Sequence, residues 1–244
     1  MTIMKKSLIC LVALVGLTFG FTSCEKESLG KTRITYYATL ELEGDEYIEI
    51  NKGDAYSEPG FKAVMNGQDV SDKVVVEGEV NPNVAGVYDV TYTIVNADGF
   101  SSSAARQVVV FDAADPIQGH WACTPTSFRT NANTGAEVAY GAPFEIMIVG
   151  NNGDGNYFVD DLLAGWYCQR AGYGTSYAMQ AVIAVAADGA ISLKGSYVPG
   201  WGDAADELSA DSKFDAATNT ITYAVTYAGY LIFNVTLIKV DYYL

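Results

Sequence analysis

The chain has 244 residues, half of them hydrophobic, with 17 Tyr, 10 Phe and 3 Trp. This composition is sufficient for packed cores and excludes a wholly disordered chain. The 29 acidic residues outnumber the 14 basic ones and give a formal net charge of −15. A protein this acidic repels phosphate backbones, which argues against nucleic-acid binding.

The first 23 residues have the three parts of a secretory signal. Lys5 and Lys6 precede an apolar run over 8–21, and Thr22 and Ser23 supply small residues before a cleavage point. A retained membrane-spanning helix is the alternative, because the stretch without charge is close to spanning length. The glycines and hydroxyl residues within that stretch favour cleavage.

Cys24 follows this small pair, and charge begins directly after it in Glu-Lys-Glu, residues 25–27. The pattern Thr22-Ser23-Cys24 resembles the lipobox of bacterial lipoproteins, with Phe21 where leucine is commoner. In that family the cysteine sulfur receives a diacylglycerol and the signal is cut before it. We therefore expect lipidation of Cys24, with an ordinary secreted cysteine as the alternative. Two or more acyl chains give a lasting membrane anchor, whereas one chain holds only marginally.

The acidic segment 25–27 is similar to the export tag of Bacteroidetes-type lipoproteins; an acidic solvated linker is the alternative. The resemblance implies a protein of the outer membrane, lipid-anchored and facing the cell exterior. The sequence thus predicts a signal peptide over 1–23 and a lipid-anchored tether over 24–33.

Residues 34–112 contain short runs rich in Val, Ile, Tyr and Thr, which favour strands, with turn residues between them. In VYDVTYTIV, residues 87–95, the side chains alternate as they do in a strand with one wet face. Five or more such strands in about 80 residues predict an Ig-like sandwich.

Three stretches carry a family resemblance: GDAYSEPGFKA (53–63), AGVYDVTYTIVNADG (85–99) and RQVVVFD (106–112). They resemble bacterial Ig-like modules that are common in surface lipoproteins. The resemblance implies a spacer or docking module without chemistry of its own. It makes Tyr56, Pro59 and Gly60 turn and packing residues.

A short linker is expected over 113–118, and residues 119–244 are again rich in strands separated by Gly and Asn turns. This pattern of consecutive hairpins, without a long amphipathic helix, predicts an antiparallel meander that forms a barrel or a sandwich. The opening Gly119-His120-Trp121 and the late stretch 214–227 are similar to lipocalin-like domains appended to Ig-like modules. The expected fold class is all-β, an N-terminal Ig-like β-sandwich followed by an antiparallel lipocalin-like β-barrel or sandwich, with Trp121 in the core.

Residues suited to catalysis or metal binding are few. His120 is the only histidine, so a catalytic triad or a zinc site has too few members. Asp160 and Asp161 are adjacent, and adjacent strand residues point to opposite faces, so they would not flank one glycosidic bond. The oxygen-rich loop NNGDGN, 151–156, could suit calcium but is better explained as a hairpin turn. We expect no catalytic residues, no metal and no cofactor.

Cys123 and Cys168 are the cysteines that remain beyond position 24. An even pair in an exported protein indicates a possible disulfide. Two buried free thiols are the equal alternative, because cysteine packs as a small hydrophobe.

Aromatic residues gather in glycine-rich segments that are expected to be loops. An exposed ring there can stack on a sugar face or a peptide side chain, with Gln169, Arg170 and Asp203 supplying hydrogen bonds. In the alternative, Trp166 and Trp201 pack in the ends of the barrel. The candidate ligand-binding residues are Trp166, Tyr167, Tyr173, Tyr197 and Trp201.

Together the resemblances imply an accessory lipoprotein of Sus-type uptake systems, in which an outer-membrane transporter with a lipoprotein lid imports glycans or peptides. The predicted function is non-catalytic binding or docking. A structural or adhesive surface lipoprotein without a small ligand is the alternative, and a glycan-processing enzyme is the less favoured one.

Overall fold

The computed structural model describes residues 34–240. The predicted signal peptide and the whole predicted tether, which includes Cys24, lie outside these residues. Strands make up 49% of the structure and helices 5%, which confirms the all-β prediction. No helix within the described residues is long and apolar enough to cross a membrane.

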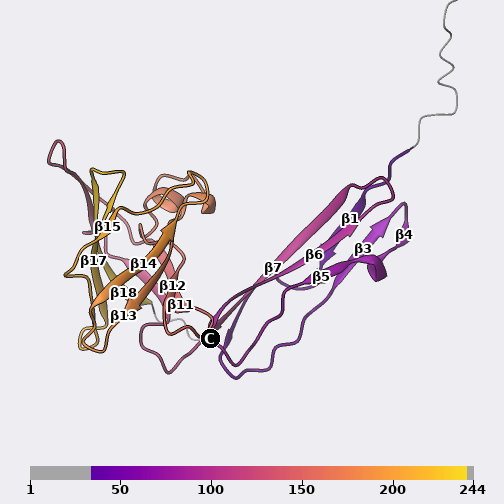
Figure 1. Ribbon diagram of the computed structural model, residues 1–244, viewed down its shortest axis with the longest axis horizontal. Coiled ribbons are helices and arrows are strands. Elements are labelled where there is room, and N and C mark those ends of the chain that lie inside the picture. The colour runs from indigo at the N-terminus through magenta and orange to yellow at the C-terminus, as the bar shows by residue number, and fades with distance from the viewer. Residues whose placement is uncertain (1–33, 241–244) are drawn as a thin grey trace, which may run out of the picture. The chain divides into compact units, whose positions relative to one another are not determined.

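Residues 38–111 form the two sheets of an Ig-like sandwich (Figure 1). One sheet has the order β1 (Ala38–Leu42), β3 (Phe61–Met65) and β4 (Gln68–Asp69). The other has the order β2 (Tyr47–Asn51), β7 (Ser101–Phe111), β6 (Gly86–Val95) and β5 (Val75–Glu77), with β2 parallel to β7. The short 3-10 helix η1 (Ser71–Lys73) follows β4.

The alternation predicted for residues 87–95 is present in β6, where Val90, Tyr92 and Ile94 are buried and Val95 is exposed. Ile94 joins Ala63 and Val70 in the core between the two sheets. Burial of one face of each sheet is what stabilises the sandwich, because apolar area removed from water contributes about 25 cal/mol per Å².

Arg106, on β7, is fully buried in this sandwich. Its guanidinium donates to the carbonyl oxygens of Asp45, at 2.8 Å, and Glu43, at 2.5 Å, and pairs with the Glu58 carboxylate. Tyr56 also donates to Glu58, at 2.5 Å. Arg106 and Tyr56 therefore meet at the Glu58 carboxylate, and Arg106 ties this segment to the one that contains Glu43 and Asp45.

The remaining strands form one antiparallel sheet. Its main path is β10 (Ala136–Ala139), β9 (Phe128–Asn131), β18 (Leu231–Val240), β8 (Gly119–Cys123), β11 (Glu145–Gly150), β12 (Tyr157–Val159), β13 (Gln180–Val185) and β14 (Ile191–Tyr197). β17 (Thr220–Tyr227) also pairs with β18, and it carries β15 (Glu207–Leu208) and β16 (Lys213–Asp215).

The sheet curls into a half-barrel, which answers the choice between barrel and sandwich that the sequence left open (Figure 1). The amide of Ile191 donates to Ser212 O at 2.9 Å, and that of Phe214 donates to Gly189 O at 2.8 Å. These bonds bring the beginning of β14 beside β16. The curl encloses a core without requiring a complete ring of strands.

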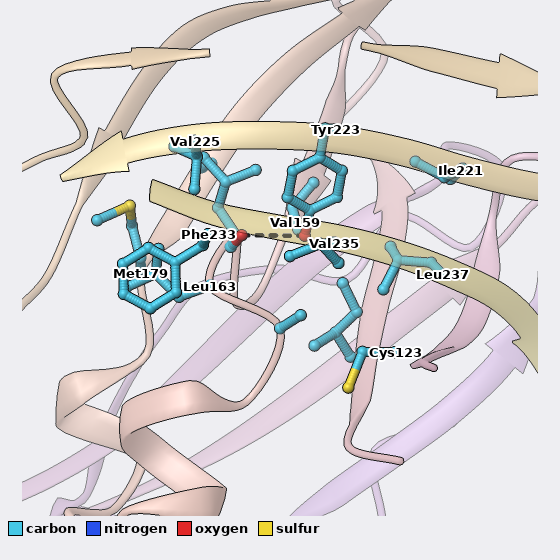
Figure 2. Close-up of a cluster of buried hydrophobic side chains, with 14 of the residues drawn as sticks. Cys123, Val159, Leu163, Met179, Ile221, Tyr223, Val225, Phe233, Val235 and Leu237 are labelled. Atoms are coloured by element: carbon cyan, nitrogen blue, oxygen red, sulfur yellow. Dashed lines mark hydrogen bonds between the residues drawn. The ribbon is translucent and has the colours of Figure 1, made fainter. Parts of the chain in front are cut away.

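The core inside the curl is built from inward residues of the sheet and from the segment after β12. Figure 2 shows Leu163, Met179 and Phe233 packed together, with the Tyr223 hydroxyl directed at a backbone oxygen. That hydroxyl donates to Leu162 O at 2.9 Å. Trp121 is fully buried in the same core, as predicted, and its indole N–H donates to Ile117 O at 2.9 Å.

Candidate binding site

The segment between β12 and β13 carries most of the predicted site residues. It contains the π-helix η2 (Trp166–Arg170) and the 3-10 helix η3 (Thr175–Tyr177). η2 begins after Gly165, whose φ is +81° and where a Cβ would lie 2.5 Å from the Cβ of Phe144. Only glycine combines this left-handed backbone with so close a neighbour. The turn therefore fixes where η2 starts.

Asp161 anchors this segment from inside the core, where it is 2% exposed. Its carboxylate accepts the amides of Leu163 at 3.0 Å, Gly165 at 2.9 Å and Met179 at 3.0 Å, and the Cys168 thiol at 3.0 Å. Burial raises the pKa of Asp161, and these donors oppose the rise. A buried carboxylate is tolerated only when it is hydrogen-bonded in this way. Asp161 consequently ties both ends of the segment together.

Cys123 and Cys168 are both free thiols, so the disulfide considered for them is not formed in the structure. The Cys168 thiol is occupied by Asp161, and burial together with that carboxylate raises its pKa. Cys123 is buried and accepts the Phe144 amide at 3.3 Å. The structure has the alternative of two free packing thiols.

Four aromatic rings surround Trp201, and the five residues together are called here the Trp201 cluster. Its members are Tyr167, Tyr173, Tyr177, Trp201 and Tyr227. The centroid of the Trp201 ring lies 4.7 Å from Tyr167, 4.9 Å from Tyr177, 6.1 Å from Tyr173 and 6.2 Å from Tyr227. Trp201 remains 41% exposed and Tyr173 55% exposed. Rings that hold one another in place while presenting open faces form a ready stacking surface.

The loop that carries Trp201 is held against η3. The Gly200 amide donates to Ser176 O at 2.6 Å, and a Cβ on Gly200 would lie 2.6 Å from the ring of Tyr177. On the other side of the loop, the Tyr227 hydroxyl donates to Asp203 at 2.8 Å. Burial and this carboxylate raise the pKa of Tyr227, which stays protonated and keeps Asp203 at the rim of the cluster.

The structure brings three of the five predicted ligand-binding residues together, namely Tyr167, Tyr173 and Trp201. Trp166 is only 3% exposed, and its ring packs against Tyr140 at 4.8 Å. That is the packing role weighed as its alternative. Tyr197 on β14 is 51% exposed, and within the described residues no ring contact joins it to the Trp201 cluster.

Sequence reasoning missed two members of the cluster. Tyr177 lies in the glycine-containing stretch 172–177 together with Tyr173, and this closeness could have indicated it. Tyr227 lies at an inward position of β17, whose alternating burial could have indicated that its ring faces the interior of the curl.

The residues considered for catalysis and metal binding are dispersed. His120 lies 3.0 Å from a carboxylate oxygen of Glu49, and Asp160 accepts the Met147 amide at 2.8 Å. Burial raises the pKa of Asp160 to about 7, and the charge of Asp161 adds to that rise. Across residues 34–240, no group of three or more His, Cys, Asp or Glu is placed to hold a metal ion.

The NNGDGN loop joins antiparallel β11 and β12 as a hairpin turn, as predicted. The Asn151 amide donates to Asn156 O at 2.9 Å, and its side chain donates to Asp154 at 2.7 Å. The polar groups of this loop thus bond to one another, as is usual for Asn and Asp in turns.

An Ig-like sandwich followed by a half-barrel is the architecture of a modular bacterial surface protein, and two family models agree with it. One, described as "Bacterial surface protein, Ig-like domain", matches residues 40–110, and one described as a C-terminal domain matches residues 110–239. The chain is similar to the crystal structure of the lipoprotein BT2262 from Bacteroides thetaiotaomicron. The identity is 38%, the TM-score is 0.59, and the match covers 83% of this chain and 100% of that one. The chain belongs to the same family as that lipoprotein.

Two more distant structures are parts of ZmpB from Clostridium perfringens. One contains the M60 catalytic domain with CBM51-1 and CBM51-2, and its match covers 52% of this chain and 14% of that one. The other contains CBM51-2 in complex with GlcNAc and INT domains, with 82% and 44% covered. Both are 12% identical with a TM-score of 0.26, which is too low to bear on function. No curated protein matches the chain.

Proposed function

We propose that this protein is a non-catalytic lipoprotein of the outer membrane that binds a glycan on the Trp201 cluster. In this proposal Cys24 carries the lipid anchor, and the Ig-like sandwich serves as a spacer. The half-barrel would face the cell exterior and act as an accessory component of a Sus-type uptake system, beside the transporter and its lipoprotein lid.

The exposed Trp201 cluster is the observation that carries the proposal. Single exposed rings are common on protein surfaces, but a contiguous group of exposed rings marks a binding surface. Here Trp201 and Tyr173 stay open although their neighbours fix their orientation. Asp203 stands at the rim as a hydrogen-bond acceptor. A flat ring with polar groups beside it suits the apolar face and the hydroxyl groups of a sugar.

A glycan is proposed in preference to a peptide because exposed rings with a carboxylate beside them suit the apolar face and the hydroxyl groups of a sugar. The proposed mode of binding is stacking on the open rings of Trp201 and Tyr173, with Asp203 beside them as a hydrogen-bond acceptor.

The test is a calorimetric titration of the full-length protein in detergent against panels of glycans and peptides. Trp201→Ala should weaken glycan binding tenfold or more, since truncating a central aromatic typically costs on the order of 2 kcal/mol. Phe100→Ala removes another half-exposed ring, outside the cluster, and should leave affinity unchanged. Failure of every panel would instead favour the structural or adhesive alternative.

The place in an uptake system has a separate test. The tagged protein, isolated from cells of its source grown on the bound glycan, should carry an outer-membrane transporter with it. Absence of any transporter after mild crosslinking would remove the Sus-type part of the proposal and leave the binding part standing.

A further inference from the structure

Two arginines, Arg129 and Arg170, are the only ones in residues 117–240, and both lie over the ring of Trp166. The Cζ atom of Arg129 is 4.8 Å from the ring centroid, and that of Arg170 is 4.2 Å from it. Arg129 comes from β9 and Arg170 from the last turn of η2. Elements far apart in sequence thus bring two positive charges to one ring, in a chain whose net charge is strongly negative.

Arg129 points toward the interior of the curl. It is the register partner of Phe233 on β18, and cross-strand partners share a face of the sheet; Phe233 is fully buried. The Nε atom of Arg129 is buried and has no hydrogen-bond partner. An inward-facing charge with an unsatisfied donor is costly, and such a group is a functional candidate.

Arg170 is exposed and uses its Nε to donate to Tyr140 O at 3.1 Å. Within residues 34–240, neither Arg129 nor Arg170 forms an ion pair with a carboxylate. Attraction to the Trp166 ring offsets part of the cost of holding them there, but it leaves the guanidinium N–H groups without an anion.

The arginine pair is continuous with the Trp201 cluster. Arg129 acts on the hydroxyl of Tyr167, where it opposes the rise in the pKa of Tyr167 that burial causes. The ring of Tyr167 in turn contacts that of Trp201 at 4.7 Å. A ligand stacked on Trp201 would therefore have the two positive charges beside it.

We propose that the glycan bound on the Trp201 cluster carries an anionic substituent, a carboxylate or a sulfate, which Arg129 and Arg170 recognise. This inference rests on the proposed function and names the substrate class of the same site. Guanidinium groups bind carboxylate and sulfate oxygens through charge-assisted, often bidentate hydrogen bonds. At physiological ionic strength the screening length is about 8 Å, so the charges that act on a bound anion are those close to it, the two arginines and, with opposite sign, Asp203 at the rim of the cluster.

Matched ligands separate the anion from the sugar. Oligogalacturonides and their methyl esters share one backbone and differ at the carboxyl group, and sulfated galactan oligosaccharides compare likewise with their desulfated, neutral forms. The full-length protein should bind at least one charged member tenfold or more tightly than its neutral partner. That preference should weaken as salt is added, because a charge-assisted contact is screened.

Variants of the two arginines test which residues recognise the anionic group of the glycan. In Arg129→Gln the ratio of charged to neutral affinity should fall to near one, and in Arg170→Gln it should fall several-fold. Lys194→Gln removes an exposed positive charge from β14, outside the site, and should keep the full ratio. Arg170 is exposed, so its variant keeps the test valid if Arg129→Gln folds poorly.

Three results would overturn the inference. Equal affinity for the charged and neutral members of both pairs would show that the site binds a glycan without recognising an anionic group. An unchanged ratio in both arginine variants would place the anion elsewhere. Binding of acidic peptides in place of glycans, or of nothing at all, would defeat the proposed function itself, because Trp201 would then have no sugar to stack on.

Discussion

Arg106 in the Ig-like sandwich and Arg129 in the half-barrel both point into the protein, but their surroundings differ. Arg106 reaches two carbonyl oxygens, the Tyr92 hydroxyl at 3.4 Å and the Glu58 carboxylate. Arg129 lies over an indole ring and keeps a buried Nε–H without an acceptor. Groups of the chain itself accept the hydrogen bonds of Arg106, whereas the Arg129 Nε–H has no acceptor in the chain.

This difference supports the separate roles that the proposed function gives to the two regions. A buried charge whose partners all come from the chain itself contributes to a single, well-defined fold. A charge left incompletely satisfied beside an exposed aromatic cluster offers a ligand the interactions that the protein lacks. On this view the Ig-like sandwich is built for structure and the open side of the half-barrel for binding.

The largest expected effect is the loss of stability when Arg106 is replaced, compared with the same replacement of Arg129. Arg106→Met should lower the free energy of unfolding by about 3–5 kcal/mol, because it leaves Glu58 and two carbonyl groups without their buried partner. Urea unfolding followed by circular dichroism measures it. Arg129→Met, of similar size change, should cost only about 1 kcal/mol, since it removes mainly a cation–π contact. Equal losses in the two variants would show that Arg129 is as structural as Arg106.

A smaller effect concerns the pH dependence of stability near Asp160. Burial raises the pKa of Asp160 to about 7, above its ordinary value of 3.8, so the folded protein keeps a proton that the unfolded chain loses. The stabilising contribution is therefore full at low pH and is lost as pH rises toward 7. Asp160→Asn keeps an acceptor for the Met147 amide and should remove on the order of 2 kcal/mol of that decline between pH 5 and pH 8, with a discount for partial exposure. Parallel unfolding free energies for wild type and variant across this range would refute the assignment.

The smallest effect concerns the loop that carries Trp201. Gly200→Ala places a Cβ 2.6 Å from the Tyr177 ring and 2.9 Å from Ser176 O, so the loop must shift. We expect a loss of about 1 kcal/mol in stability and a several-fold loss in glycan affinity. Gly195→Ala meets no atom within 4 Å and serves as the matched control, with neither property reduced. Calorimetry and thermal unfolding of the two variants check both.

Much of this fold follows from the sequence because its signals are local. The alternation in residues 87–95, the turn at NNGDGN and the buried Trp121 depend on neighbours in the chain or on plain burial. The resemblance to bacterial Ig-like modules added the order of the parts, and the family shown for the chain agrees with it.

The candidate site could be predicted only in part because its contacts are long-range. Aromatics in glycine-rich segments indicated Tyr167, Tyr173 and Trp201, but nothing local distinguishes exposed Trp201 from buried Trp166. Arg129 was missed because its inward direction depends on pairing between β9 and β18, about a hundred residues apart along the chain. The anchoring by Asp161 was also missed, since adjacent Asp160 and Asp161 look alike in sequence.

The most direct test of glycan binding at Trp201 is quenching of tryptophan fluorescence by acrylamide. Trp121 and Trp166 are buried, so the quenchable signal should come from Trp201 and should vanish in Trp201→Phe. A glycan at saturating concentration should shield that signal in the wild-type protein. If the saturated protein is quenched as readily as the free one, the sugar does not lie on Trp201 and the account is wrong.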